Sequence, residues 1–442
     1  MPQAPALSQS LSAPMPRSEV LVLGAGMVGI GTALALQSRG HAVTVVDRHA
    51  VAGRETSLGN AGVIQGEAME PYAMPRDLGS LLRYGLGMGN DLRWHLRDLP
   101  AAAPALWAYF KASAPDKHAR ISRIYSQLIA RGVADHAAYI AAANCGELVR
   151  TTGLGEIYRT SKAYEKAAGK ALQMRDRYGL SLTLLTQTEL QREEPALTCP
   201  RGDAPIRNAQ APTIAGAILW PDSWSTSDPA ALTAAYADLF KARGGDIVQG
   251  DAMSLRAHKA GWQMDSATGR LSGSDVVIAL GPWSPDLLRA MGYEIQMLWK
   301  RGYHQHYATA QALTRPYLDA ENGFVMSSMS QGLRITTGAE IVRRDAPADL
   351  RQLRHARHAA GELLEISADA PTSAPWIGHR PCLARMLPMV GRAPARGGGA
   401  HKGLWFNFGH GHQGLTLGPT TGHLLADMFE GEQTDLSRAL AY

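Results

Sequence analysis

The apolar residues near the start of the chain change their spacing twice within a short stretch. Val20 to Leu23 form an apolar run of the kind found in buried strands, and a turn rich in glycine follows it. Residues 30–38 are mostly helix formers, and Val43 to Val46 form a second apolar run that ends at Asp47. The pattern predicts a strand, a turn, a helix and a second strand. The glycines of the turn interrupt the uncharged run 20–36 and argue against a membrane span there.

The turn has the spacing Gly-x-Gly-x-x-Gly. Gly24 permits the tight turn out of the strand, Gly26 lacks the Cβ that would block a pyrophosphate, and Gly29 lets the helix pack close to the strand. Backbone N–H groups at the start of the helix then face the phosphates, and Asp47 is placed to accept hydrogen bonds from a ribose. The segment therefore predicts a dinucleotide-binding site and leaves FAD and NAD as alternatives.

The residues after Asp47 point to FAD. Asp47-Arg48 and residues 53–62 (Gly-Arg-Glu-Thr-Ser-Leu-Gly-Asn-Ala-Gly) resemble the stretch that FAD-dependent oxidoreductases of the D-amino acid oxidase and dehydrogenase superfamily carry after the second strand. A polar turn fits the same composition, so the placement after Asp47 carries the resemblance. A second match is Gly281-Pro282-Trp283-Ser284, which ends an apolar strand at 275–280. In the family, such a strand ending in Gly-x-Trp-Ser returns the chain to the cofactor domain.

The C-terminal part carries the most specific match. Gly378-His379-Arg380-Pro381, residues 387–391 and residues 403–414 resemble the C-terminal pattern of D-amino acid dehydrogenases, which ends in Gly-His-Gly and a closing helix. The closing helix is expected from about 418 to 430, with its N-terminus toward the edge of the flavin that becomes negative on reduction. The resemblance covers nearly the whole chain from Ser18 onward.

The resemblance and the glycine turn together assign a set of residues to FAD binding. They are Gly24, Gly26, Met27, Val28, Gly29, Asp47, Arg48, Thr56, Ser57, Asn60, Ala61, Gly62, Val248, Gly281, Trp283, Gly378, Gly409, Gly411, His412, Gln413, Gly414, Leu415 and Thr416.

The length of 442 residues exceeds what one hydrophobic core usually serves. We expect an α/β protein with a Rossmann-like, three-layer FAD-binding domain and an interleaved α+β substrate-binding domain built on a mainly antiparallel sheet. The expected FAD segments are 18–65, 215–290 and 376–442, and the expected substrate segments are 66–214 and 291–375. Residues 1–17 lack the apolar core of a secretory signal and are expected to form a disordered leader.

Arg380 is the predicted substrate-binding residue, because a guanidinium can hold an α-carboxylate through two parallel hydrogen bonds. The resemblance implies the same role, and an Arg held in an ion pair is the alternative. Tyr303 matches a Gly-Tyr of the family's substrate lobe and is expected to add a hydroxyl to that carboxylate. His304 and His306 alternate with Tyr303 and Tyr307, which predicts the two His on one strand face and the two Tyr on the other.

Several other side chains carry weaker expectations. Arg385 stands where the family commonly has an acid, which is compatible with a changed specificity or with a surface position. Cys382 raises the question of a covalent flavin bond, but its spacing does not match and a buried, inert thiol is expected. His410 and His412 lack a third ligand at a defined spacing, so no metal site is predicted.

The three cysteines are far apart in the sequence, which suits a reducing compartment. The formal net charge of +5 is small for a chain of this length and argues against a nucleic-acid partner. A cytoplasmic protein is expected. Aromatic and arginine residues between Leu81 and Phe110 are compatible with peripheral contact to the inner face of the membrane, or with a lobe core carrying snorkelling arginines.

The predicted activity is oxidation of the C–N bond of a D-amino acid, with hydride transfer from Cα to flavin N5. The imine product hydrolyses to a 2-oxo acid and ammonia, and the electrons pass to a quinone or to oxygen. One alternative is oxidation of secondary amines or glycine, such as sarcosine, glycine or hydroxyproline. The other is a non-catalytic FAD-binding subunit of a larger complex, against which the intact Arg380 motif weighs.

Overall fold

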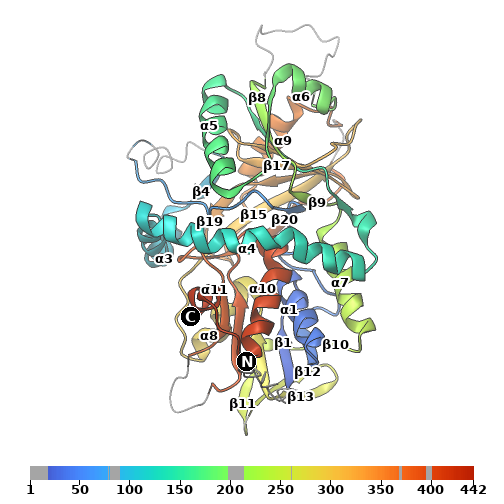
Figure 1. The fold of residues 1–442 in the computed structure, drawn as a ribbon, viewed down its shortest axis with the longest axis vertical. Helices are drawn as coiled ribbons and strands as arrows, with labels where there is room; N and C mark the ends of the chain where they lie inside the picture. Colours follow the sequence, from blue (N-terminus) through green and yellow to red (C-terminus); the bar gives the residue numbers. More distant parts are fainter. Residues whose placement is uncertain are drawn as a thin grey trace, which may run out of the picture.

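The computed structural model describes residues 18–77, 79, 90–197, 214–259, 261–367, 371–394 and 401–442. The expected leader 1–17, Cys199 and the first part of the aromatic stretch, residues 81–89, lie outside these residues. Two large sheets organise the described chain, one in the lower and one in the upper half of Figure 1, and the long helix α4 (Pro115–Ala142) crosses between them.

The lower sheet has six strands, and all its neighbours are parallel except the last pair. In spatial order the strands are β10 (Asp246–Gln249), β2 (Ala42–Asp47), β1 (Glu19–Leu23), β14 (Asp275–Ile278), β22 (Leu404–Phe408) and β21 (Met389–Arg392). The two apolar runs of the N-terminal pattern are the neighbouring strands β1 and β2, joined by helix α1 (Met27–Ser38), as predicted.

The side chains of β1 divide between two layers because successive residues of a strand point to opposite faces. Val20 and Val22 pack among the helices α1, α4, α7 (Pro229–Ala242) and α10 (Gly414–Phe429). Leu21 and Leu23 pack against a small antiparallel sheet of β11 (Arg256–His258), β12 (Gly261–Ser266) and β13 (Gly269–Gly273). The expected three-layer Rossmann-like arrangement is confirmed.

Helices α1 and α10 approach each other through glycines. A Cβ on Gly31 would lie 2.7 Å from the carbonyl oxygen of Gly418, and one on Gly422 would lie 2.5 Å from that of Gly31. Both distances are far inside van der Waals contact, so the two backbones touch directly at these positions. The starts of both helices are thereby held on one side of the sheet (Figure 1).

Helix α10 begins at Gly414, so the expectation of a start near Gly418 is wrong. The error comes from Pro419, which lies inside the helix and cannot donate to the carbonyl of Leu415. The buried imidazole of His136 supplies the missing donor, with its Nε2 at 2.8 Å from the Leu415 oxygen. A proline is therefore tolerated in the second turn.

The upper sheet has ten strands and is mainly antiparallel, as expected; only the pairs β4–β19 and β6–β16 are parallel. Its main path runs through β4 (Leu92–Trp94), β19 (Ala339–Ile341), β15 (Met297–Tyr307), β18 (Gly332–Thr337), β17 (Phe324–Met329), β16 (Tyr317–Asp319), β6 (Leu154–Tyr158), β8 (Gly216–Trp220) and β7 (Thr183–Thr186). The tenth strand, β20 (Trp376–Leu383), pairs with β15.

The remaining elements surround these sheets. They are the strands β3 (Val63–Ile64), β9 (Trp224–Thr226) and β5 (Val149–Arg150), which form a small sheet, and the helices α3 (Leu99–Ala112), α5 (Ser161–Tyr178), α6 (Gln187–Glu193), α8 (Ser284–Ala290), α9 (Arg351–Gly361) and α11 (Asp435–Leu440). Among the described helices, none combines the length and the apolar character that crossing a bilayer requires.

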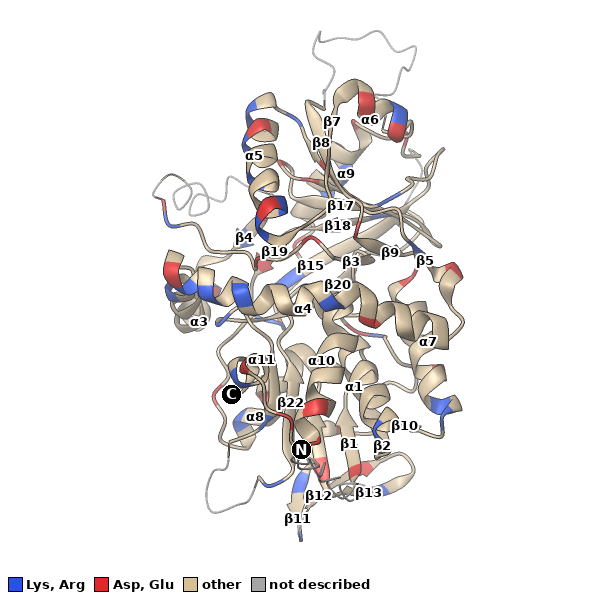
Figure 2. Cartoon of the chain, viewed as in Figure 1, with Lys and Arg blue, Asp and Glu red and all other residues tan. Residues whose placement is uncertain are grey.

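The two large sheets divide the chain slightly differently from the expected domain segments. The lower sheet takes two strands from each expected FAD segment. However, β8 and β20 lie in the expected FAD segments 215–290 and 376–442 and belong to the upper sheet. Basic and acidic residues are interspersed over the described parts of both halves (Figure 2).

Candidate active site

A cavity of about 1460 Å³ is lined by residues of both large sheets. The lower half contributes the glycine turn after β1, the C-terminal ends of β2 and β10, and the N-terminus of α10. Residues of β15 and β20 and of helix α3 also line the cavity. The lining therefore combines backbone-rich turns with charged and aromatic side chains.

The glycine turn has the geometry that was predicted for it. Gly24 has a φ of +108°, and a Cβ there would lie 2.5 Å from the carbonyl oxygen of Ala279. A Cβ on Gly29 would lie 1.8 Å from the oxygen of Gly24, so helix α1 can pack this close to the turn only with glycine. The φ at Gly24 and the close packing at Gly29 therefore both require glycine.

Two polar side chains hold the turn from outside. The Asp47 carboxylate accepts from the backbone N–H of Ala25 at 2.7 Å and from that of His49 at 2.8 Å. The hydroxyl of Ser57 accepts from the N–H of Met27 at 3.0 Å, at the start of α1. Both side chains also line the cavity, so they shape the wall that the turn presents.

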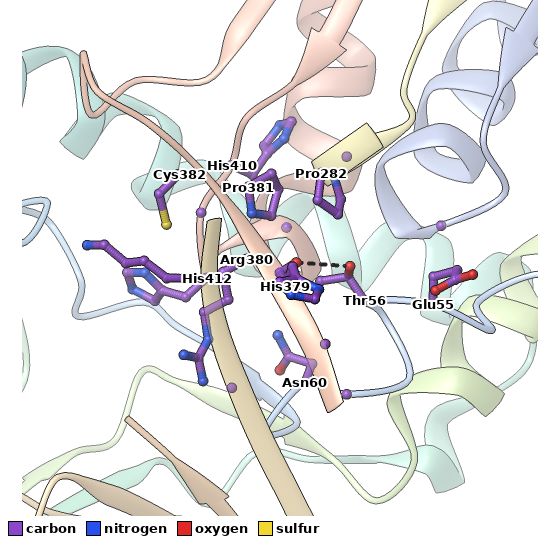
Figure 3. Close-up of a pocket in the computed structure, with 18 of the residues that line it drawn as sticks. Glu55, Thr56, Asn60, Pro282, His379, Arg380, Pro381, Cys382, His410 and His412 are labelled. Carbon is purple, nitrogen blue, oxygen red and sulfur yellow. Dashed lines mark hydrogen bonds between the residues drawn. The ribbon is translucent and has the colours of Figure 1, made fainter. Parts of the chain in front are cut away.

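The loop after β2 is fixed by charge and stacking. The guanidinium of Arg48 lies 3.9 Å from the ring centre of Trp283 and forms an ion pair with Glu55 at 3.1 Å. The Thr56 hydroxyl donates to the carbonyl of His379 at 3.2 Å, which ties the loop to β20 (Figure 3). These contacts join the loop after β2 to Trp283 and to β20, three segments that the resemblance assigned to the cofactor.

Most of the residues predicted to bind FAD line this one cavity. They are Gly24, Gly26, Met27, Val28, Asp47, Arg48, Thr56, Ser57, Asn60, Ala61, Gly281, Trp283, Gly378, Gly409, Gly411, His412, Gly414 and Leu415.

The other five predicted residues support the wall from behind. Gly29 packs α1 on the turn, and Gly62 has a φ of +80° next to Thr226. Val248 lies in β10, immediately before the lining residues Gln249 and Gly250. The remaining two form hydrogen bonds with Gln65: its side-chain carbonyl accepts from Gln413, and its backbone N–H donates to Thr416.

The cavity fits an extended dinucleotide such as FAD. Gly26 leaves the space in front of the α1 N-terminus free of a side chain, where backbone N–H groups attract phosphate. The N-terminus of α10 lines the same cavity through Gly414 and Leu415, where it favours negative charge. The glycine turn would hold the pyrophosphate, and the β20 and α10 segments would border the flavin.

Arg380 lies on β20, lines the cavity and does not form an ion pair among the described residues. Its guanidinium donates to the carbonyl oxygens of Gly338 at 2.8 Å and of Thr337 at 2.9 Å. It reaches them across Gly302, where a Cβ would lie 2.6 Å from Nη2. Two hydrogen bonds fix the guanidinium, and its other N–H groups remain for a ligand.

Tyr303 is buried and lines the cavity, and its hydroxyl belongs to a hydrogen-bond network with Glu340, Asp349 and Arg301. The hydroxyl donates to the Glu340 carboxylate at 2.5 Å and accepts from the N–H of Asp349 at 3.0 Å and from Arg301 at 3.3 Å. The expectation that this hydroxyl binds a substrate carboxylate has no support in these contacts, since the hydroxyl already donates its hydrogen bond to Glu340.

The same network contains a group of possible metal ligands in His95, Glu340 and Asp349, whose ligand atoms lie within 4.8 Å of one another. His95 lies 2.6 Å from Glu340, Arg301 lies 3.7 Å from it, and Arg351 forms an ion pair with Asp349. Two guanidinium groups at these carboxylates disfavour a cation there, so we interpret the group as an ion-pair network.

The histidines of β15 follow the predicted alternation. His304 and His306 lie on one face with ring centres 5.2 Å apart, and His304 stacks on Trp376 at 5.0 Å. Burial, the largest cause, together with Arg334 lowers the pKa of His306 to about 4. Burial, the largest cause, also lowers the pKa of His304, so both imidazoles are neutral packing groups around neutral pH.

Cys382 and Arg385 lie in different surroundings. Cys382 lines the cavity, and burial raises the pKa of its thiol, which supports the expected inert role. Arg385 does not line the cavity; it donates to the backbone carbonyls of Ala439 and of Ala441, the latter at 2.6 Å. The residue that departs from the family pattern therefore holds the end of helix α11.

The sequence reasoning did not find Lys300, which also lines the cavity. Lys300 lies directly opposite Arg380 in the pairing of β15 with β20, and its ammonium lies 4.7 Å from the ring centre of Tyr109. Its place directly after the apolar residues Met297 to Trp299 and before Arg301 in a mostly buried strand was a signal that could have identified it.

Comparisons with known proteins identify the family of the chain. Residues 19–428 match the family described as DAO, FAD dependent oxidoreductase. The chain is 30% identical to a D-amino acid dehydrogenase of Paramagnetospirillum magneticum, over 95% of this chain and 96% of that protein. It is 25% identical to a D-amino-acid oxidase of Bradyrhizobium diazoefficiens, over 95% of this chain and 97% of that protein.

Among solved structures, glycine oxidase from Geobacillus kaustophilus superimposes with a TM-score of 0.70 at 20% identity, over 96% of this chain and 98% of that chain. This likeness shows the fold. The resemblance inferred from the motifs, and FAD as the cofactor, are confirmed by the family match over most of the chain. The chain therefore belongs to the DAO family of FAD-dependent oxidoreductases.

Proposed function

We propose that this FAD-dependent oxidoreductase oxidises the C–N bond of a D-amino acid and releases a 2-oxo acid and ammonia after hydrolysis of the imine. The observation that carries the proposal is the guanidinium of Arg380, fixed at the cavity by two carbonyls and without an ion pair among the described residues. Two relatives named for D-amino acids support the class of substrate.

The residues of the chain would bind and orient the substrate. The free N–H groups of Arg380 hold the α-carboxylate, and this fixes the direction in which the Cα–H bond points. FAD, when bound, supplies the two-electron acceptor that takes hydride from Cα. The neutral imidazoles of His410 and His412, whose pKa values burial lowers to about 3, add no positive charge beside the substrate amine.

We further propose a quinone or another respiratory acceptor for the electrons, because several relatives are named dehydrogenases. Contact with the cytoplasmic face of a membrane would suit such an acceptor. Oxygen is the other acceptor that the relatives' names allow. Reduced enzyme mixed with a soluble quinone and, separately, with oxygen measures which acceptor reoxidises the flavin faster.

The test of the substrate class is anaerobic mixing of the FAD-loaded protein with D-amino acids, L-amino acids, glycine and sarcosine while the flavin absorbance is followed. Bleaching by D-amino acids is expected. Bleaching by sarcosine or glycine alone would replace the proposal with secondary-amine or glycine oxidation. Absence of bleaching with every compound would favour a non-catalytic subunit.

The role of Arg380 is tested by Arg380→Met. Loss of charged hydrogen bonds to the carboxylate costs about 1.5–3 kcal/mol each, so KM should rise about 10-fold or more while FAD stays bound. Arg385→Met is the matched control, because Arg385 also binds backbone carbonyls but lies outside the cavity. An unchanged KM in Arg380→Met, with the fold checked by circular dichroism, would remove Arg380 from substrate binding.

A further inference from the structure

We propose that Lys300 and Arg380 form a two-cation site that binds both carboxylates of a dicarboxylic amino acid. This inference rests on the proposed function, since it names the substrate class for the same site. Arg380 takes the α-carboxylate, and Lys300 takes the second carboxylate on the side chain.

The backbone positions of the two cationic residues are paired between neighbouring strands. Lys300 on β15 lies directly opposite Arg380 on β20 in the antiparallel register. Residues directly opposite in such a pair project to the same face of the sheet. Both side chains line the cavity, and Figure 3 shows Arg380 with Cys382 and His412 on one side of β20.

The charged ends of the two side chains then diverge. The Arg380 guanidinium crosses over Gly302 to the carbonyls of Thr337 and Gly338, on the far side of β15. The Lys300 ammonium lies over the ring of Tyr109 on helix α3. Because the two heads point to different elements, they suit two anionic groups of one ligand better than a single shared carboxylate.

The pair has no internal counter-ion in the described part of the chain. The ion pairs of the described residues include neither Lys300 nor Arg380, although other carboxylates line the cavity. Glu55 pairs with Arg48, and Asp286 pairs with Arg344. These two lining carboxylates are therefore engaged elsewhere.

Like charges directly opposite in a sheet destabilise it, and the face of Tyr109 offsets only part of this repulsion. The neighbouring thiol of Cys382 remains protonated, because burial raises its pKa. Both cations also act on His412, whose imidazole stays neutral as burial, with Arg380 and Lys300, lowers its pKa to about 3. Two positive charges with separate positions thus lie at one cavity, where they would attract two negative groups of a ligand.

The first experiment compares pairs of substrates that differ only in charge. Anaerobic flavin reduction is measured with D-glutamate against D-glutamine and with D-aspartate against D-asparagine. The unaltered protein should prefer an acid over its amide by about 10- to 100-fold in kcat/KM. In Lys300→Met this preference should disappear, and Lys300→Arg should restore part of it.

Lys111→Met is the matched control, because Lys111 lies on helix α3 but is exposed and outside the cavity. It should leave the acid preference unchanged. Equal losses for acid and amide in Lys300→Met would show that Lys300 acts on the α-carboxylate, and this would overturn the two-carboxylate proposal. An unaltered protein without acid preference would overturn it too.

The second experiment measures binding without turnover. Calorimetric titration of the FAD-loaded protein with glutarate and succinate, against butyrate and propionate, should give a Kd about 10-fold or more lower for the dicarboxylates. If no amino acid reduces the flavin while dicarboxylates still bind through Lys300, the proposed function fails and the two-cation site stands. If amino acids reduce the flavin and dicarboxylates show no advantage, the two-cation site fails alone.

Discussion

Gly302 lies beneath the Arg380 guanidinium, and we expect Gly302→Ala to displace that guanidinium from the cavity wall. The added Cβ would lie 2.6 Å from Nη2 and 2.9 Å from Cζ, so the arginine must leave the carbonyls of Thr337 and Gly338. The three atoms nearest to the added Cβ all belong to the flexible Arg380 side chain and none to the backbone, so the protein should still fold. KM for the amino acid should rise about 10-fold, measured by steady-state kinetics with the FAD content unchanged.

Gly146→Ala serves as the control, because a Cβ there meets no atom within 4 Å. It should leave KM unchanged. A normal KM in Gly302→Ala would mean that the Arg380 position does not depend on the space above Gly302.

At this scale the sequence predicts some site residues and misses others. Arg380 could be identified because its motif is local and its chemistry is specific. The position of Lys300 at the cavity could not be predicted, since it follows from the register that sets Lys300 opposite Arg380. Tyr303 lines the cavity, and its hydroxyl donates to the buried Glu340, 37 positions away, so its contact with a substrate carboxylate stays a prediction.

Helices α1 and α10 meet through backbone atoms, and we expect Gly31→Ala to separate them. The new Cβ would lie 2.7 Å from the oxygen and 2.8 Å from the carbonyl carbon of Gly418. Neither atom can rotate away, so the free energy of unfolding should fall by about 1–3 kcal/mol, measured by chemical denaturation. FAD retention should fall as well, because the starts of both helices line the cavity.

The control for this substitution is Gly169→Ala in helix α5, where a Cβ has open space. Its stability should stay the same or rise slightly, since Ala favours a helix over Gly. Equal stability of the two variants would contradict the proposed backbone contact between α1 and α10.

Elements with local signals were predictable, whereas those that depend on distant partners were not. The strands β1 and β2 and the turn between them follow from apolar runs and glycine spacing. The start of α10 was placed too late because Pro419 is tolerated only through His136, which lies 279 positions from the carbonyl that it satisfies. The place of β20 in the upper sheet likewise depends on its pairing with β15.

For the whole molecule we expect a loss of stability as the pH falls from about 6.5 toward 5. Six histidines have pKa values lowered to between about 2 and about 4, with burial as the largest cause: His136, His304, His306, His379, His410 and His412. The unfolded chain takes up these protons near pH 6.5 and the folded chain does not, so acidification favours unfolding.

Thermal denaturation at pH 8, 6.5 and 5 measures this dependence. The Tm should change little between the first two values and fall between the last two, above the range where exposed carboxylates titrate. Glu67 and Glu156 act in the opposite direction, because burial raises their pKa values, but they are outnumbered. A constant Tm down to pH 5 would show that these imidazoles are protonated in the folded protein.

The order of strands in the lower sheet has a consequence for how the protein matures during synthesis. β1, near the N-terminus, pairs with β14, and β14 pairs with β22 close to the C-terminus. The cavity wall also includes Gly409 to Leu415, which follow β22 in the chain. The glycine turn is made early, but part of the cavity that it faces forms only after residues 404–415 have been added. Cofactor loading must therefore follow the emergence of residues 404–415 from the ribosome, and a truncation before residue 404 should yield a protein that never acquires FAD.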